Sequence, residues 1–259
     1  MGAAQYDKIG SGYDNLTALD SAKLGKLYIE ETVTPLIASG KRKTVDLACG
    51  TGRFSHALRS FGADSVLGVD VSGAMIDAAT ASNTDPNVTF LVGDCADPST
   101  RYQEGPFDLA LGSWLLNYAP SGDEMAKMFR HAANNLSDDG VFVTLNPHLS
   151  EDPAKHIAEA LELRPPVKNM VAVMQTGEVE QGVKTKIWAG TEPEPVQFEA
   201  YNLRASVYEQ AARDGGFRGS MKRIDCTVPD LAKQRGECKG AWDAYGTVPH
   251  ATILVAAKN

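Results

Sequence analysis

The chain has 259 residues, of which 43% are hydrophobic and 22% are charged, a composition typical of a soluble globular protein. Its 25 basic and 33 acidic side chains give a net charge of −8, and no basic run is longer than Lys41-Arg42-Lys43. Nucleic acids and anionic membranes both require a basic surface, so neither is expected as a partner. The four cysteines form no C-x-x-C pair, which argues against a disulfide framework and a metal site.

The amino terminus lacks the basic-then-apolar pattern of a secretion signal, and no apolar run is long enough to cross a bilayer. We therefore expect a cytoplasmic protein, either a monomer or a homodimer. The length suits one large domain that carries an additional lobe.

Residues up to about Ser39 show helical spacing of their apolar side chains. Beyond them, β-type runs alternate with amphipathic stretches as far as the middle of the chain. The five runs are residues 44–48, 65–69, 88–92, 107–111 and 141–145. Alternation of this kind predicts a parallel sheet wound by right-handed crossovers, that is, a doubly wound, Rossmann-like α/β fold.

After Pro147 the pattern changes to a helix over 152–163 and two β-like pieces at 185–189 and 196–201. A helix over 206–216 and strands at 221–228 and 252–257 then bring the sheet to seven strands. We therefore divide the chain into a helical cover (1–40), a core (41–150), an inserted lid (151–203) and a carboxyl-terminal part (204–259).

The segment Val45-Asp-Leu-Ala-Cys-Gly-Thr-Gly-Arg-Phe54 runs from a predicted strand through a glycine turn into a helix. Such a turn lets a ligand approach the backbone and the helix amino terminus. A phosphate-binding P-loop is excluded because Arg53, not lysine, follows Gly52. A dinucleotide fingerprint matches only in part, because Ser55 occupies its third glycine position. The acid at Asp46 favours a ligand with a positive charge, an ammonium or a sulfonium.

This segment resembles motif I of the class I S-adenosylmethionine-dependent methyltransferases, and later segments resemble the motifs that follow in that family. The resemblance covers residues 5 to 146. Asp70 matches the acid on the ribose hydroxyls, Met75 the apolar residue on the adenine, and Asp94 the acceptor of the adenine amino group. The opening Gln5 to Asp14 resembles small-molecule methyltransferases, and most of all the toxoflavin-biosynthesis-like N-methyltransferases.

The resemblance implies S-adenosyl-L-methionine as cofactor, S-adenosyl-L-homocysteine as product and no metal. Its implied cofactor-binding residues are Tyr6, Tyr13, Asp46, Ala48, Gly50, Gly52, Asp70, Val71, Met75, Asp94, Cys95 and Ser113. Either tyrosine could instead pack the first helix onto the sheet.

The acceptor side of the site is less clearly marked. His148 follows the fifth predicted strand, so it is the histidine best placed to act as a general base. His56, His131, His156 and His250 are interpreted as surface or packing residues. Trp114, Tyr118 and Trp188 could line an aromatic substrate pocket or belong to the core.

We therefore predict an S-adenosylmethionine-dependent methyltransferase acting on a small molecule, with a nitrogen or oxygen acceptor of the secondary-metabolite type. One alternative is a protein that binds S-adenosylmethionine without transferring methyl. The other is a nicotinamide-dependent oxidoreductase, which would use the same kind of glycine turn.

Overall fold

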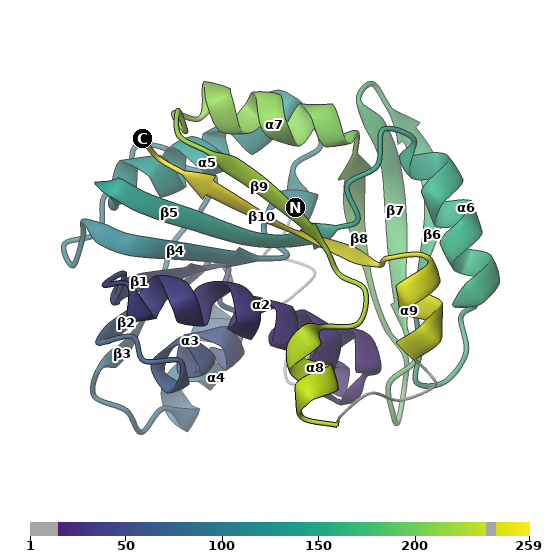
Figure 1. Cartoon of the computed structure of the whole chain (residues 1–259), viewed down its shortest axis with the longest axis horizontal. Coiled ribbons are helices and arrows are strands. Elements are labelled where there is room, and N and C mark those ends of the chain that lie inside the picture. Colours follow the sequence, from purple (N-terminus) through teal and green to yellow (C-terminus); the bar gives the residue numbers. More distant parts are fainter. Residues whose placement is uncertain (1–14, 237–241) are drawn as a thin grey trace.

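The computed structural model describes residues 15–236 and 242–259, in which a seven-stranded sheet forms the centre of the molecule (Figure 1). The strands lie in the order β3-β2-β1-β4-β5-β10-β9. β10 is antiparallel to both of its neighbours, whereas the pairs among β1 to β5 are parallel. This confirms the predicted doubly wound, Rossmann-like fold. The bounds are β1 (Lys43–Leu47), β2 (Ser65–Asp70), β3 (Val88–Val92), β4 (Phe107–Ser113), β5 (Leu136–Pro147), β9 (Met221–Asp225) and β10 (Ala251–Ala257).

Helices cover both faces of this sheet. They are α2 (Asp20–Ala38), α3 (Arg53–Ser60), α4 (Gly73–Ser82), α5 (Gly122–Asn135) and α7 (Ala205–Asp214). The short helices α8 (Asp230–Gln234) and α9 (Asp243–Thr247) pack against α2, and a 3-10 turn, η2 (Leu116–Tyr118), follows β4. Successive residues of a strand point to opposite faces, so β5 contributes to two cores. Phe142 packs with α5 and α7, whereas Val141 and Val143 pack with α2 and α3. Burial on both faces explains the near-continuous apolar runs of these strands.

A second sheet of three antiparallel strands lies between β5 and α7 in the sequence. Its strands are β6 (Val171–Val179), β7 (Gly182–Ala189) and β8 (Val196–Leu203), and it follows α6 (Pro153–Leu163). Figure 1 shows α6 and this sheet at one end of the central sheet, beyond the carboxyl ends of β4 and β5. Strand β6 was not predicted, because Gln175 to Gly177 interrupt its apolar pattern at the point where the register with β7 shifts.

In residues 15–236 and 242–259, no helix is both long and apolar enough to span a membrane.

Candidate functional site

A cavity of about 970 Å³ lies at the carboxyl ends of the parallel strands. The segments after β1, β2, β4 and β5 form one wall, and the second sheet, α6 and the start of α2 form the other. Ligands of doubly wound sheets bind at this edge, because the strand order reverses there and leaves a crevice.

The turn after β1 bends sharply into α3. Ala48, Gly50 and Gly52 have φ angles of 62°, 55° and 85°, which lie in the left-handed region where a side chain causes strain. A Cβ on Gly52 would lie 2.6 Å from Cζ of Phe90, so no larger residue fits there. A Cβ on Gly50 would meet no atom within 4 Å. Ala48 and Gly50 line the cavity, whereas Gly52 shapes the turn from behind and does not line it.

Asp70, at the end of β2, is only 8% exposed and lines the cavity. Its Oδ2 accepts a hydrogen bond from the backbone N–H of Gly50 at 2.8 Å, and its Oδ1 accepts one from Ser72 at 2.9 Å. The carboxylate therefore joins the end of β2 to the turn after β1. Val71, the next residue, is 42% exposed and also lines the cavity.

The structure corrects the expectation for Asp46. Its side chain is 1% exposed, accepts a hydrogen bond from Ser55 Oγ at 2.7 Å and does not line the cavity. Burial raises the pKa of Asp46 to about 7, partly opposed by the Ser55 bond. Asp46 lies in the centre of the sheet, where β1 pairs with both β2 and β4, and its side chain is buried without lining the crevice. It therefore supports the turn from inside the protein, without direct contact with a ligand in the cavity.

The wall formed after β2 and β3 holds the residues expected near an adenine. Met75 is 2% exposed on the first turn of α4, whose amino terminus Ser72 caps by accepting from Met75 N–H. Asp94 is exposed, lines the cavity and accepts from Ala96 N–H at 2.8 Å. Cys95 also lines the cavity, and burial raises the pKa of its thiol to about 12. A thiol with so high a pKa stays protonated at neutral pH, so Cys95 is not expected to act as a nucleophile.

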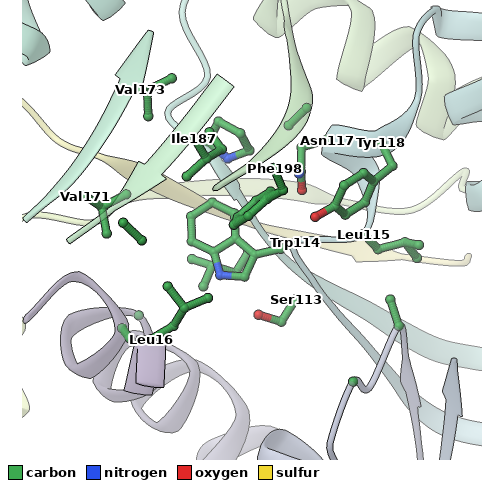
Figure 2. A pocket seen from close by; sticks show the side chains of 18 of the residues that line it. Leu16, Ser113, Trp114, Leu115, Asn117, Tyr118, Val171, Val173, Ile187 and Phe198 are labelled. Atoms are coloured by element: carbon green, nitrogen blue, oxygen red, sulfur yellow. The ribbon is translucent and has the colours of Figure 1, made fainter. Parts of the chain in front are cut away.

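The segment after β4 crosses the middle of the cavity (Figure 2). Trp114 has a φ of 60° and donates its backbone N–H to Leu145 O at 2.8 Å, a strained conformation that directs the indole into the cavity. Ser113 and Asn117 are 7% and 3% exposed and line the cavity. Within the described residues, Ser113 Oγ and Asn117 Oδ1 have no hydrogen-bond partner. Buried polar atoms without a protein partner at a cavity are ready for a ligand.

The second sheet supplies the apolar wall opposite Trp114. Figure 2 shows Val171, Val173, Ile187 and Phe198 pointing into the space around the indole, with Leu16 and Leu115 at its margins. Tyr118 lines the same space, and burial raises the pKa of its hydroxyl.

The prediction that Trp188 lines the substrate pocket is wrong. Its neighbours Ile187 and Ala189 line the cavity, so the alternation of strand β7 turns Trp188 to the other face of the second sheet.

His148 lies directly after β5 and lines the cavity, as expected from the sequence. Its Nδ1 lies 3.2 Å from Thr252 Oγ1 and 3.4 Å from Asp225 Oδ1. Its ring stands 4.2 Å from the ring of His156, measured between centroids. Burial is the main cause that lowers the pKa of His148, so the imidazole is neutral at pH 7.

Two further histidines line this cavity, although the sequence did not predict them there. His156 reaches it from α6 and His250 from the start of β10, and burial lowers their pKa values to about 4 and about 3. The antiparallel pairing of the last strand with β5 could have indicated His250, because Ala251 pairs with Pro147. His131, by contrast, is a buried packing residue that bonds Tyr102 and the carbonyl of Asp97. Tyr6, Tyr13 and the opening segment from Gln5 to Asp14 lie outside the described residues.

The central segment is similar to known methyltransferases. Residues 44–140 match the family model described as a methyltransferase domain. A demethylmenaquinone methyltransferase from Beutenbergia cavernae is 30% identical over 131 residues, which cover 49% of this chain. The match spans only 52% of that relative, about half of its length.

Solved structures of similar fold cover nearly the whole chain. One is a putative S-adenosylmethionine-dependent methyltransferase from Listeria monocytogenes, with a TM-score of 0.58 and 20% identity, covering 93% of this chain and 99% of that one. Another is a sugar N-methyltransferase from Streptoalloteichus, with a TM-score of 0.54 and 20% identity, covering 98% and 92%. Several of the solved structures of this fold are S-adenosylmethionine-dependent methyltransferases, and S-adenosylmethionine is the cofactor that the sequence resemblance implies. Residues 44–140 therefore resemble a methyltransferase domain, and the chain has the fold of solved S-adenosylmethionine-dependent methyltransferases.

Proposed function

We propose that this protein transfers a methyl group from S-adenosylmethionine to a small molecule, at a nitrogen or an oxygen atom. The observation that carries the proposal is that one cavity contains both halves of such a site. The residues after β1 and β2 form the cofactor half, and Trp114 with the second sheet forms the acceptor half.

The residues on the cofactor side suit S-adenosylmethionine. Asp70 offers a carboxylate to ribose hydroxyls, and Met75 offers an apolar surface to the adenine. We assign Asp94, which lines the same cavity, as the acceptor of the adenine amino group, and Ser113 Oγ is a buried polar atom that a ligand could bond. When bound, the cofactor supplies a methyl group attached to a sulfonium, and this methyl is transferred as the C–S bond breaks and its electron pair returns to sulfur. The chain's own task is to align the acceptor atom with that methyl.

The acceptor half favours a small, largely apolar molecule. A volume of about 970 Å³ for the whole cavity is near the upper end of small-ligand sites, which leaves room for two ligands. Apolar side chains from β6, β7 and β8 close the space, so we assign residues 151–203 as the substrate lid. The similarity to a demethylmenaquinone methyltransferase and to a sugar N-methyltransferase is compatible with small acceptors of either chemistry. The net charge of −8 disfavours a nucleic acid.

His148 is our proposed general base. It stands on the same edge as Gly50 and Asp70, and it is neutral at pH 7 because burial lowers its pKa. General-base help accelerates a reaction by about 10²–10⁴ where the acceptor atom must lose a proton.

The test is a thermal scan with S-adenosylhomocysteine and, separately, with NADH. A ligand that binds only the folded state stabilises it by about 2.7 kcal/mol at a hundredfold excess over its Kd. We expect the melting temperature to rise with S-adenosylhomocysteine and to stay constant with NADH. No shift at millimolar S-adenosylhomocysteine would refute the proposal, and a shift with NADH alone would favour an oxidoreductase. Transfer of radiolabelled methyl to an extracted metabolite separates an enzyme from a protein that only binds the cofactor.

A further inference from the structure

Three side chains from three adjacent strands form a hydrogen-bonded array behind the cavity. Thr252 of β10 pairs with Asp225, the last residue of β9, while His148 follows β5 on the other side of β10. Thr252 Oγ1 donates to Asp225 Oδ1 at 2.9 Å and lies 3.2 Å from His148 Nδ1. The sheet register therefore places a carboxylate, a hydroxyl and an imidazole in line.

The hydrogen atoms of this array can be assigned by counting donors. The single hydroxyl proton of Thr252 is used in the bond to Asp225. Thr252 Oγ1 also accepts from the backbone N–H of Leu149 at 3.2 Å. The contact between Thr252 Oγ1 and His148 Nδ1 needs a proton of its own, which must come from Nδ1. The neutral imidazole of His148 is therefore the Nδ1–H tautomer, and its Nε2 carries the lone pair.

We propose that Thr252 and Asp225 are positioning residues that hold His148 with Nε2 as the base of the cavity, and that the acceptor is consequently an O–H or N–H compound. This inference rests on the proposed methyl transfer. An acceptor that is already a free nucleophile, such as a tertiary amine, gives no proton to a base. A hydroxyl or a protonated ring nitrogen does.

The proposed step transfers one methyl group and one proton. The acceptor atom forms a bond to the methyl carbon, and the C–S bond breaks with its electron pair returning to sulfur. The O–H or N–H proton of the acceptor moves to Nε2 of His148. The imidazolium formed in this way keeps its Nδ1–H on Thr252 and lies 3.4 Å from the carboxylate of Asp225. The opposite charge stabilises it at the moment of transfer.

The charged and titratable groups around His148 come from three elements. Asp225 and Arg223 face it from β9, His156 from α6 and His250 from the start of β10. Asp225 raises the pKa of His148, whereas burial and Arg223 lower it. His156 is kept neutral because burial lowers its pKa, and its Nε2 lies 2.9 Å from Pro249 O, to which it donates. The two neighbouring imidazoles, whose ring planes are tilted by 33°, are therefore neutral at pH 7, and Nε2 of His148 can take a proton.

The experiment is nitrogen-15 NMR of the imidazole rings in the full chain saturated with S-adenosylhomocysteine. The protein has only five histidines, so the His148 signals can be assigned from their loss in His148→Gln. We expect the neutral Nδ1–H tautomer at pH 7.5, with an unprotonated Nε2. The opposite tautomer, with the proton on Nε2, would overturn the proposal, because that nitrogen could then not accept one.

Variants of the array separate positioning from packing. Asp225→Asn should lower the pKa of His148, because the charge that raises it is lost. Arg223→Gln, two residues away on the same strand, should raise that pKa. Thr252→Val should reduce the Nδ1–H population, and Thr252→Ser should restore it. Identical His148 titrations in wild type, Asp225→Asn and Arg223→Gln would also overturn the proposal.

This result is independent of the test for methyl transfer. If S-adenosylhomocysteine fails to stabilise the protein, the proposed function fails, whatever the tautomer of His148. If it binds and His148 carries its proton on Nε2, only the positioning proposal fails.

Discussion

The carboxylate of Asp70 and the backbone amide of Gly50 lie 2.8 Å apart, although twenty residues separate them in the chain. This bond fixes the glycine turn against the end of β2, so one side chain both shapes the turn and presents a charge to the cavity. Motif I and the acid after β2 therefore act as one unit.

Replacing Asp70 with alanine should weaken S-adenosylhomocysteine binding by about 10- to 100-fold. Charge-assisted hydrogen bonds of this kind contribute about 1.5–3 kcal/mol, and each 1.4 kcal/mol is tenfold in affinity. Titration calorimetry of both proteins measures the change. Asp77→Ala, an exposed acid on α4, is the matched control because it changes the net charge equally. Equal affinities for wild type and Asp70→Ala would mean that another group holds the ribose.

Ala48 should be a source of strain in the turn after β1. At a φ of 62°, a Cβ costs roughly 1 kcal/mol that glycine avoids, so Ala48→Gly should stabilise the protein by about 0.5–1 kcal/mol. The reverse change at Gly50 tests the same effect, because its φ is 55° and an added Cβ would meet no atom within 4 Å. Gly50→Ala should therefore destabilise by about 1 kcal/mol through φ alone. Urea unfolding measures both, and effects of equal sign would contradict the argument.

The side-chain oxygen of Asn117 gives a prediction that can be tested without knowing the methyl acceptor. Its Oδ1 is buried and has no partner within residues 15–236 and 242–259, so Asn117→Leu should raise the free energy of unfolding by about 1–3 kcal/mol. Asn135 is the control, since it is also 3% exposed but fully bonded. It accepts from Tyr102 N–H and donates to Thr100 O and His131 O, so Asn135→Leu should destabilise. A loss of stability in Asn117→Leu would show that its amide is satisfied in solution.

The cofactor half of the site could be predicted because its residues lie within short segments at strand ends. The glycine turn, Asp70 and Asp94 each follow a β-type run directly, and the common direction of parallel strands brings them to one edge. The acceptor half depends on tertiary pairing that a linear pattern does not contain. Trp188 was misplaced because the face of a strand follows from its register, and β6, its neighbour, was not predicted.

The histidines also show that a linear sequence pattern does not predict tertiary contacts. His148 was found from its place after β5, but His156 and His250 reach it only through the packing of α6 and the antiparallel return of β10. Asp225 and Thr252 likewise carry no local signal, because their contact is a cross-strand pair between β9 and β10. Asp46 matched its motif and yet points inward, since a motif records which residue is present and not the direction of its side chain.

The last prediction concerns that buried carboxyl. Burial raises the pKa of Asp46 to about 7 in the folded protein, above its ordinary value of 3.8 when unfolded. Between pH 4 and pH 7 the folded state therefore binds a proton that the unfolded state has lost, and stability falls as pH rises through this window. Above about pH 7 both states are ionised and the contribution stays constant. Asp46→Asn removes this titration while keeping an oxygen for Ser55 Oγ to donate to.

The stability gained by Asp46→Asn over wild type should therefore grow with pH, by an amount of the order of 3–4 kcal/mol between pH 4 and pH 8. Urea unfolding of the ligand-free proteins at several pH values gives this difference directly, and the titration of the other groups cancels in it. If the stability difference between Asp46→Asn and wild type is the same at pH 5 and pH 8, Asp46 is ionised over this whole range. Its Oδ1 must then find a hydrogen-bond partner in the protein or in water.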